Sequence, residues 1–379
     1  MKKDERIAVV GAGLGGLTAA AMLQQAGFHV DVYEQAPSFI RIGAGIHLSA
    51  NVMKVMRAVG VEKSLAAVGL HPDAFVSRDW STGETLFELP LAEAGEAAYG
   101  AEYINVHRGD LHEILASALK PGTIQFGKHL ASLSEQGDRA TLHFSDGSEA
   151  QAGLVIGADG INSAVRTHLF GPEEPYFTEH IAHRAVFSAE LLKGARIRDC
   201  TKWWGDGYHI LVYYTTNARN EVYFVSSMAQ AEWNTSASFV PCPRDEFLAA
   251  FDGAHPELRA AVEGAPEITK WPIFERRVYP DTWSAGRVVI LGDASHAMRP
   301  YMASGAAMAI EDAAVLARCI AELDTVDDAF AWYESNRMPR VRKVQQISAT
   351  NTWFRQPTDP AWLFDYDASS IPLEAPQPA

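Results

Sequence analysis

The sequence predicts an α/β fold in which a Rossmann-like, parallel-sheet domain carries an inserted domain built on a mixed or antiparallel β-sheet. A strand, a glycine-rich turn, a helix and a second strand follow one another within residues 7–34. Two later apolar runs, at 154–156 and 288–291, lead into glycine and aspartate. Between them, residues 171–277 contain alternating, aromatic-rich segments typical of antiparallel hairpins.

Composition and charge limit the partners of the chain. Its 379 residues are 47% apolar and 21% charged, which suits a globular protein of two or three domains. The net charge of −15 provides no basic face for nucleic acid and disfavours an anionic membrane surface. The three widely spaced cysteines predict free thiols in a reducing compartment, the cytoplasm. No cluster has metal-ligand spacing, so we expect no metal.

The first 34 residues carry a nucleotide-binding fingerprint. The uncharged stretch 7–30 resembles a signal peptide or a membrane span, but its glycines have the spacing of a nucleotide loop. We expect a strand at 7–10, a turn at 11–16, a helix at 17–25 and a strand at 30–33. The pattern GxGxxG predicts a tight turn, close approach to a pyrophosphate and close packing of helix and strand. The residues expected to bind the nucleotide here are Gly11, Gly13, Gly15, Gly16, Glu34 and Gln35.

Two aspartates mark the same edge of the predicted sheet. Asp159 and Asp293 each follow a strand, and we expect helices after them at 163–169 and 305–321. A second complete GxGxxG is absent from the sequence, so we expect one resident dinucleotide, with any nicotinamide reductant binding transiently. The expected nucleotide domain comprises residues 1–70, 104–170 and 278–345, and the β-rich substrate domain 71–103 and 171–277. Residues 346–379 are expected to form a C-terminal segment with a loose tail from Ser369.

Three motifs, in this order and spacing, resemble those of the single-component (class A) FAD-dependent aromatic hydroxylases, the group of para-hydroxybenzoate and salicylate hydroxylases. They are 11–16 with Glu34, 157–160, and 292–293 with the loop 300–305. The resemblance extends from about residue 7 to 342. It implies tightly but non-covalently bound FAD, NADH as transient co-substrate, O2, and a monomer or homodimer. It also implies FAD contacts from Arg108, Leu130, Asp293, Gly305 and Ala306.

Within this family the chain resembles the 6-hydroxynicotinate 3-monooxygenases at residues 41–47, 202–204, 209–216, 268–272 and 308–314. That resemblance implies hydroxylation of a small aromatic acid through a flavin C4a-hydroperoxide, with loss of the carboxyl group and formation of 2,5-dihydroxypyridine. His47 would then be the catalytic base, and Tyr213 would supply a hydroxyl beside the substrate. The remaining substrate-binding residues would be His209, Cys200, Tyr301 and Met302.

The residues themselves support parts of this hypothesis. A histidine suits deprotonation of a ring hydroxyl because its ordinary pKa is near 6.5. Residues 209, 211 and 213 share one face of a predicted strand, and 208, 210, 212 and 214 share the other. Lys202 or Arg299 could pair with a substrate carboxylate. Glu311 and Asp312, on the last predicted helix, are expected to be structural.

The substrate is left open by four departures in the loop after residues 292–293. Ser295, Ala297, Tyr301 and Ser304 stand where the 6-hydroxynicotinate enzymes have Cys, Pro, His and Gln. The alternative is therefore a salicylate-type enzyme, or one acting on another hydroxypyridine or hydroxybenzoate. A flavin halogenase is disfavoured because its tryptophan motif is missing from the sequence. A non-catalytic FAD-binding protein is disfavoured by the complete set of motifs.

Overall fold

A parallel sheet forms one half of the molecule. The computed structural model describes residues 5–41 and 44–376. The six strands lie in the order β18-β19-β11-β1-β2-β7, and all neighbours are parallel except β18 and β19. The apolar run of β1 is buried because strands pair with it on both sides. The strands are β1 (Arg6–Val10), β2 (His29–Glu34), β7 (Ile124–Phe126), β11 (Leu154–Gly157), β18 (Ser284–Ala285) and β19 (Val288–Ile290).

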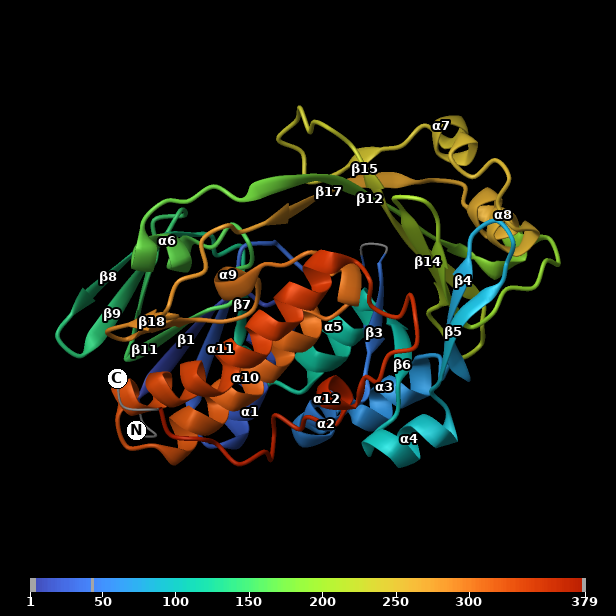
Figure 1. The fold of residues 1–379 in the computed structure, drawn as a ribbon. Coiled ribbons are helices and arrows are strands. Elements are labelled where there is room, and N and C mark those ends of the chain that lie inside the picture. The colour runs from blue at the N-terminus through green and yellow to red at the C-terminus, as the bar shows by residue number, and fades with distance from the viewer. Residues whose placement is uncertain (1–4, 42–43, 377–379) are drawn as a thin grey trace.

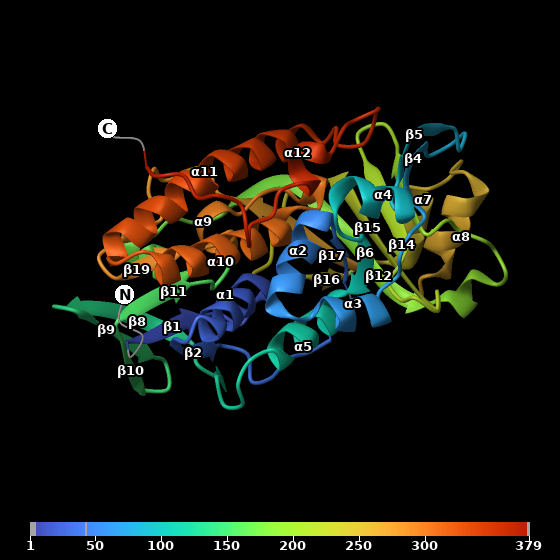
Figure 2. The ribbon, with the colours of Figure 1, turned by 90° about the horizontal axis from the view of Figure 1, so that it is seen from below.

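Helices and a small antiparallel sheet pack around the parallel sheet. Helices α1, α10 and α11 form a layer over one of its faces (Figures 1 and 2). A three-stranded sheet, order β10-β9-β8, joins the same apolar core. These elements are α1 (Leu14–Gln25), α6 (Ala164–Phe170), α9 (Asp293–His296), α10 (Gly305–Glu322), α11 (Val326–Thr350), β8 (Leu130–Gln136), β9 (Arg139–Phe144) and β10 (Glu149–Ala152).

An eight-stranded mixed sheet forms the other half, and Figure 1 shows it arching over the upper right of the molecule. Its order is β16-β17-β12-β15-β14-β13-β4-β5. Helices α7 and α8 lie at its outer end and pack in a second apolar core. These elements are β4 (Ala74–Asp79), β5 (Thr85–Pro90), β12 (Tyr176–Ser188), β13 (Cys200–Trp204), β14 (His209–Tyr214), β15 (Glu221–Ala229), β16 (Val240–Pro241), β17 (Thr269–Glu275), α7 (Arg244–Ala249) and α8 (Pro256–Gly264).

A two-stranded antiparallel ribbon, β3 with β6, lies between the two halves in Figure 1. Helices α2 to α5 and α12 lie together on one side of the molecule, the side seen in Figure 2. No helix of the described residues is long and apolar enough to cross a bilayer. The elements are β3 (Gly45–Leu48), β6 (Ile104–His107), α2 (Ala50–Val59), α3 (Glu62–Val68), α4 (Glu93–Tyr99), α5 (Arg108–Ser117) and α12 (Ala361–Phe364), with short 3-10 turns at Ala189–Leu192 and Pro300–Met302.

The predicted fold class is confirmed, and one helix boundary is wrong. Helix α1 begins at Leu14 rather than at residue 17, so Gly15 and Gly16 lie in its first turn. A Cβ on Gly15 would lie 2.7 Å from Cδ1 of Leu291, and one on Gly16 would lie 2.1 Å from the carbonyl oxygen of Gly11. The helix can begin so close to the sheet because neither residue carries a side chain.

The expectation of a loose tail from Ser369 is also wrong for residues 369–376, the part of this segment that the structure describes. The Arg318 guanidinium donates to the carbonyls of Ala368 and Ile371, and Asn336 exchanges hydrogen bonds with the backbone of Glu374. Leu373 packs against the main core. Polar side chains of α10 and α11 therefore hold this segment down. Residues 377–379 lie outside the described residues.

The expected division into domains stays a prediction. All strands of the parallel sheet fall in residues 1–70, 104–170 and 278–345, and all strands of the eight-stranded sheet fall in 71–103 and 171–277. The C-terminal segment from 346 carries α12 and packs beside α2 and α11.

Candidate active site

A cavity of about 620 Å³ opens between the carboxyl ends of the parallel strands and one face of the eight-stranded sheet. This volume lies in the range usual for cofactor and small-molecule sites. The predicted site residues that line it are His47, Tyr213, His209, Tyr301, Met302, Gly13, Gly15, Arg108, Asp293, Gly305 and Ala306. Residues far apart in the chain, from Gly13 to Ala306, thus meet in one hollow.

The glycine-rich turn forms one end of the cavity. Gly11 has φ of +100°, and a Cβ there would lie 2.4 Å from the carbonyl oxygen of Ala158. At Gly13, the residue before α1, a Cβ would approach only that same oxygen, at 4.0 Å, and would otherwise project into the cavity. Free N–H groups at the start of α1 therefore face open space, which favours an anionic group there.

Four other predicted nucleotide residues have side chains outside the lining of the cavity. The Glu34 carboxylate accepts hydrogen bonds from the N–H groups of Ala12 and Ala36, both at 2.8 Å. The Asp159 carboxylate accepts from Ser163 Oγ at 2.5 Å and from Val165 N–H at 3.1 Å, so it fixes the start of α6. Gln35 is exposed after β2, and Leu130 is buried at the start of β8. None of these four side chains lines the cavity.

His47 lies on β3. One of its ring nitrogens has a hydrogen-bond partner, and the other has none among the described residues. Its Nδ1 lies 2.7 Å from Oδ1 of Asn105, its partner in the β3–β6 ribbon. An oxygen can only accept, so Nδ1 carries the proton and Nε2 keeps its lone pair. No described residue hydrogen-bonds to Nε2. Burial lowers the pKa of His47 to about 4, so the ring is neutral at pH 7.

Tyr213 packs against this histidine. The two ring centroids are 4.2 Å apart. A Cβ on Gly45 would lie 2.6 Å from the Tyr213 ring and hydroxyl, so the glycine before His47 leaves room for the tyrosine. The expected alternation along β14 is confirmed: residues 209, 211 and 213 line the cavity, and residues 208, 210, 212 and 214 join the second core. Residues 42–43, which belong to the stretch 41–47 that resembles the related enzymes, lie outside the described residues.

A second polar group lies further along the same sheet face. The Lys202 ammonium donates to the carbonyl oxygen of Tyr301 at 3.2 Å, and Ser227 Oγ donates to the Tyr301 hydroxyl at 3.1 Å. His209 lies edge-on to the Tyr301 ring at 5.4 Å. Burial, followed by the charge of Lys202, lowers the pKa of His209 well below its ordinary value. These side chains all line the cavity.

Cys200, the expected wall residue, and Arg299, a candidate partner for a substrate carboxylate, both lie outside the lining. Cys200 is fully buried opposite Tyr213 in the β13–β14 pair and is not part of the lining, so it differs from the expected pocket wall. Burial raises the pKa of its thiol far above the ordinary value, which leaves it protonated. Arg299 forms a two-fold ion pair with Glu275, at 2.9 and 3.0 Å, so its charge is already compensated.

Several cavity residues were not predicted. Arg184 and Tyr103 line it, and so do Trp353, Phe354, Leu363 and Phe364 of the C-terminal segment. Asn105, which orients His47, was also missed. The aromatic pairs at 353–354 and 362–364 were a signal in the sequence for a buried surface. No local pattern linked Asn105 to His47, because the two lie 58 positions apart.

The charges that line the cavity are mostly positive. Arg108, Arg184 and Lys202 line it together with a single carboxylate, that of Asp293, among the described residues. This local balance is opposite to the net charge of −15 for the whole chain. A cavity of this kind attracts anionic ligands such as a pyrophosphate or an aromatic carboxylate.

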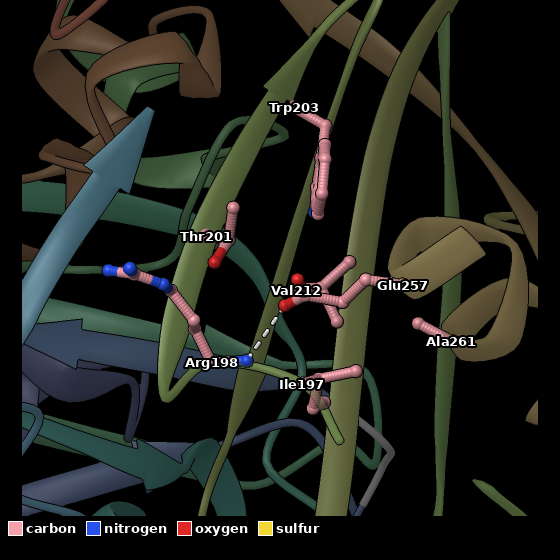
Figure 3. Close-up of a pocket in the computed structure, with 7 residues that line it drawn as sticks. All are labelled: Ile197, Arg198, Thr201, Trp203, Val212, Glu257 and Ala261. Carbon is pink, nitrogen blue, oxygen red and sulfur yellow. Dashed lines mark hydrogen bonds between the residues drawn. The ribbon is translucent and has the colours of Figure 1, made fainter. Parts of the chain in front are cut away.

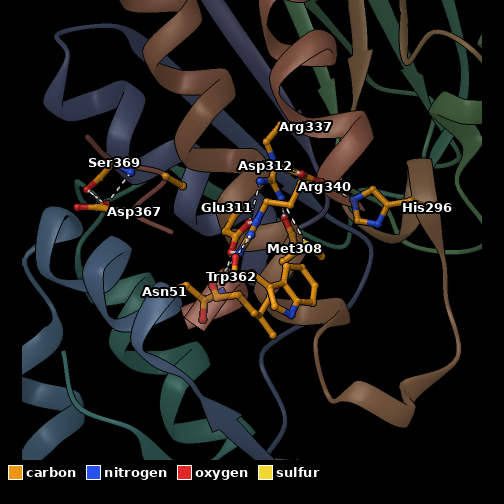
Figure 4. A network of polar contacts seen from close by, with 12 residues as sticks. Asn51, His296, Met308, Glu311, Asp312, Arg337, Arg340, Trp362, Asp367 and Ser369 are labelled. Atoms are coloured by element: carbon orange, nitrogen blue, oxygen red, sulfur yellow. Dashed lines mark hydrogen bonds and ion pairs between the residues drawn. The ribbon is translucent and has the colours of Figure 1, made fainter. Parts of the chain in front are cut away.

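A buried ionic network supports the wall on the α10 side (Figure 4). Arg337, itself fully buried, pairs with Glu311 at 2.7 Å and with Asp312 at 2.8 Å. The other Asp312 oxygen accepts from the N–H of Gly292 at 3.1 Å and contacts His296 Nε2 at 2.5 Å. The expectation that Glu311 and Asp312 are structural therefore fits this geometry. Arginines compensate the charges of these two carboxylates, whereas the sequence had suggested that the helix dipole would stabilise them.

A minor hollow lies on the far face of the same large sheet. Figure 3 shows its lining, where the N–H of Arg198 donates to the Glu257 carboxylate at 2.9 Å. This hollow is too small to admit even a water molecule. The cavity beside His47 is therefore the candidate active site.

The comparisons with known proteins agree with this geometry. The model of a family described as an FAD binding domain matches residues 4–348. The chain belongs to this family. It is 49% identical, over 98% of both chains, to the 6-hydroxynicotinate 3-monooxygenase of Bordetella bronchiseptica. It is also 38% identical to the 3-amino-4-hydroxybenzoate 2-monooxygenase of Streptomyces cremeus, over 91% of this chain and 86% of that protein.

Two solved structures share the fold of this chain. The HpxO protein of Klebsiella pneumoniae, complexed with FAD and uric acid, superposes with a TM-score of 0.80 at 26% identity, over 96% of this chain and 93% of that one. The 2,6-dihydroxypyridine-3-hydroxylase of Arthrobacter nicotinovorans gives a TM-score of 0.81 at 23% identity over 100% of both chains. The chain is thus an FAD-dependent aromatic monooxygenase of the single-component type, acting on a small aromatic substrate.

The residues present fit FAD. The open space beside Gly13 and the start of α1 suits the pyrophosphate, and Arg108 adds a positive charge in the cavity. A Cβ on Gly305 would lie 4.0 Å from Oδ1 of Asp293, so these two residues border the same space further in. FAD is therefore the cofactor. The individual contacts predicted for it stay predictions.

Replacing Gly13 with Ala tests the nucleotide end directly. Because the added methyl group would meet little of the protein and much of the cofactor space, we expect a normal fold with FAD affinity reduced about tenfold to a hundredfold. FAD content of the purified variant and its circular dichroism measure the two effects. Gly11→Ala is the contrasting variant, since its Cβ meets backbone and should lower stability as well. Full FAD retention in Gly13→Ala would contradict this role.

Proposed function

We propose that this enzyme hydroxylates 6-hydroxynicotinate with loss of the carboxyl group, forming 2,5-dihydroxypyridine with NADH and O2. The observation that carries the proposal is the 49% identity, over 98% of both chains, to the 6-hydroxynicotinate 3-monooxygenase of Bordetella bronchiseptica. The cavity adds support, because it combines positive charge with a neutral histidine. In the balanced reaction one atom of O2 replaces the carboxylate on the ring, CO2 leaves, and the other atom leaves as water.

The proposed roles follow the geometry of the cavity. His47 Nε2 takes the proton of the ring hydroxyl, since Asn105 holds the proton on Nδ1. Loss of that proton makes the ring electron-rich, which favours electrophilic attack on carbon. Tyr213 and His209 orient the ring, and Tyr301 and Met302 cover it. The buried walls exclude water from the reacting atoms. Bound FAD, once reduced by NADH, supplies the activated oxygen.

The proposed assay follows NADH oxidation and O2 uptake by the purified holoenzyme with and without 6-hydroxynicotinate. We expect the substrate to stimulate both rates and mass spectrometry to show 2,5-dihydroxypyridine and CO2 in equal amounts. The same acid without NADH is the control. Stimulated NADH oxidation that yields peroxide and no hydroxylated ring would contradict the proposal.

A second candidate is a salicylate-type enzyme, or one acting on another hydroxypyridine or hydroxybenzoate. It is favoured by Tyr301 and Ser304, two of the loop departures, because both line the cavity and border the substrate space. A panel of benzenoid and pyridine acids in the same assay distinguishes the two candidates. Hydroxylated product from benzenoid acids alone would favour the second.

We also propose that the enzyme works in the cytoplasm as a monomer or homodimer, without a nucleic acid or membrane partner. Its three cysteines are buried and unpaired, as is usual in a reducing compartment. The net charge of −15 disfavours nucleic acid and anionic lipid surfaces.

A further inference from the structure

Lys202 is a buried cation that faces the cavity. It lies on β13, and its side chain is 4% exposed and lines the cavity. The ammonium lies 4.1 Å from the centre of the Trp204 ring and donates to one backbone carbonyl, that of Tyr301. This position is rigid, since both neighbours are themselves buried.

Lys202 differs from the other deeply buried cations in having no anionic partner. Arg337 pairs with Glu311 and Asp312, and Arg166 pairs with Glu173 at 2.9 Å. No ion pair to Lys202 occurs among residues 5–41 and 44–376. Burying a charge is costly unless an opposite charge compensates it. Burial accordingly lowers the pKa of Lys202 to about 7.

The position of Lys202 matches the length of a hydroxylated ring acid. In the β13–β14 pair Lys202 lies opposite Leu211, two residues along the sheet face from Tyr213. That spacing is about 7 Å along the strand. Tyr213 in turn contacts His47, so the base lies near one end of this stretch and the ammonium near the other. A ring spanning the stretch would carry its hydroxyl toward His47 and its acid group toward Lys202.

We propose that Lys202 binds the carboxylate of the aromatic acid through its ammonium group and so selects ring acids over rings without a carboxylate. The inference rests on the proposed function, which it deepens by naming the residue that recognises the acid. His209 and Ser227 lie around the same end of the cavity and supply polar surroundings for the carboxylate. A bound carboxylate would compensate this buried ammonium, which has no ion pair among the described residues.

Binding at Lys202 would also affect the base. The charge of Lys202 contributes to the lowered pKa of His47, after the larger effect of burial. A carboxylate that compensates the ammonium removes that contribution, so the pKa of His47 rises when an acid is bound. His47 would thus become a stronger base only in the presence of the correct ligand.

The test uses Lys202→Met in the FAD-loaded enzyme and calorimetric binding of two ligands, 6-hydroxynicotinate and the carboxylate-free ring 2-hydroxypyridine. We expect Lys202→Met to weaken binding of the acid about 30-fold or more and to change binding of 2-hydroxypyridine less than twofold. Lys270→Met is the matched control, because Lys270 lies on the same sheet but pairs with Glu246. Equal weakening of both ligands, or an unchanged preference for the acid, would overturn the proposal.

Two further measurements keep the test decisive. If Lys202→Met does not fold, the wild type should bind 6-hydroxynicotinate more weakly as pH rises above about 7, with binding of 2-hydroxypyridine constant. His47 and His209 are neutral over that range, and the pKa values of Tyr213 and Tyr301 are raised. If the enzyme does not turn over 6-hydroxynicotinate, salicylate and phenol replace the two ligands. The proposed substrate can then fail while Lys202 is still tested.

Discussion

Replacing His47 with Gln is expected to lower kcat/KM for the ring acid about a hundredfold to ten-thousandfold, the usual contribution of a positioned general base. The amide of glutamine can fill part of the space and still contact Asn105, but it cannot accept the ring proton as imidazole does. Binding of the acid should change little, because Lys202 and not His47 is expected to hold its carboxylate. Steady-state kinetics with product analysis, together with calorimetry, separates these two effects.

His183→Gln is the matched control for this experiment. His183 is also buried, and burial lowers its pKa to about 4, but its ring contacts Ser226 and Phe247 and does not line the cavity. A similar loss of activity in both variants would contradict a chemical role for His47. In the wild type, kcat/KM should hold constant well below pH 6.5, because this quantity follows the free enzyme, in which His47 protonates only near pH 4.

The parts of the molecule that depend on local sequence could be predicted. The strand, turn and helix at the N-terminus follow from a buried apolar run and glycines at fixed spacing, and the face of β14 follows from strand alternation. The β13–β14 hairpin was also foreseen, since its turn residues 205–207 include two glycines. In each case the signal lies within about ten consecutive residues.

The parts of the molecule that depend on contacts between residues far apart in the sequence could not be predicted. Asn105 reaches His47 only because β3 pairs with β6, and no pattern in either segment specifies that register. Cys200 was expected at the surface of the pocket, whereas its place in β13 leaves the larger ring of Tyr213 in the lining. Leu363 and Phe364 line the cavity, and Arg340 holds their segment in place by donating to the carbonyls of Trp362 and Leu363. Such contacts become visible only in three dimensions.

The ionic network around Glu311 connects the cofactor loop to helices α2, α10 and α11. Arg340 forms a two-fold pair with Glu311 at 2.7 and 2.9 Å, and Asn51 of α2 donates to the same carboxylate at 2.6 Å. Asp312 holds the N–H of Gly292, the residue before Asp293. Burial raises the pKa values of Glu311 and Asp312. Arg340 and Arg337 at Glu311, and the contacts from His296 and Arg337 at Asp312, outweigh burial and hold both pKa values below the ordinary range. The shape of the flavin end of the cavity therefore depends on charges buried behind it.

Arg337→Met is expected to destabilise the protein by about 3–5 kcal/mol, because it removes the arginine that pairs with both Asp312 and Glu311 and leaves these two buried charges only partly compensated. FAD should dissociate more readily as well, since Asp312 holds Gly292 beside the cofactor. Urea unfolding followed by circular dichroism, with flavin fluorescence as a second signal, measures both effects. Arg342→Met, on the same helix, is the control, because Arg342 pairs with Asp281 at the exposed surface and should contribute nothing measurable.

The pH dependence of this difference provides an independent check. Carboxylates with lowered pKa values in the folded state contribute stability above their unfolded pKa, near 4, and lose it as pH falls through the folded pKa. The advantage of the wild type over Arg337→Met should therefore be largest near neutral pH and shrink on acidification below about pH 4. An advantage that stays constant down to pH 3 would show that the arginine stabilises the fold by packing, and that its charge contributes little.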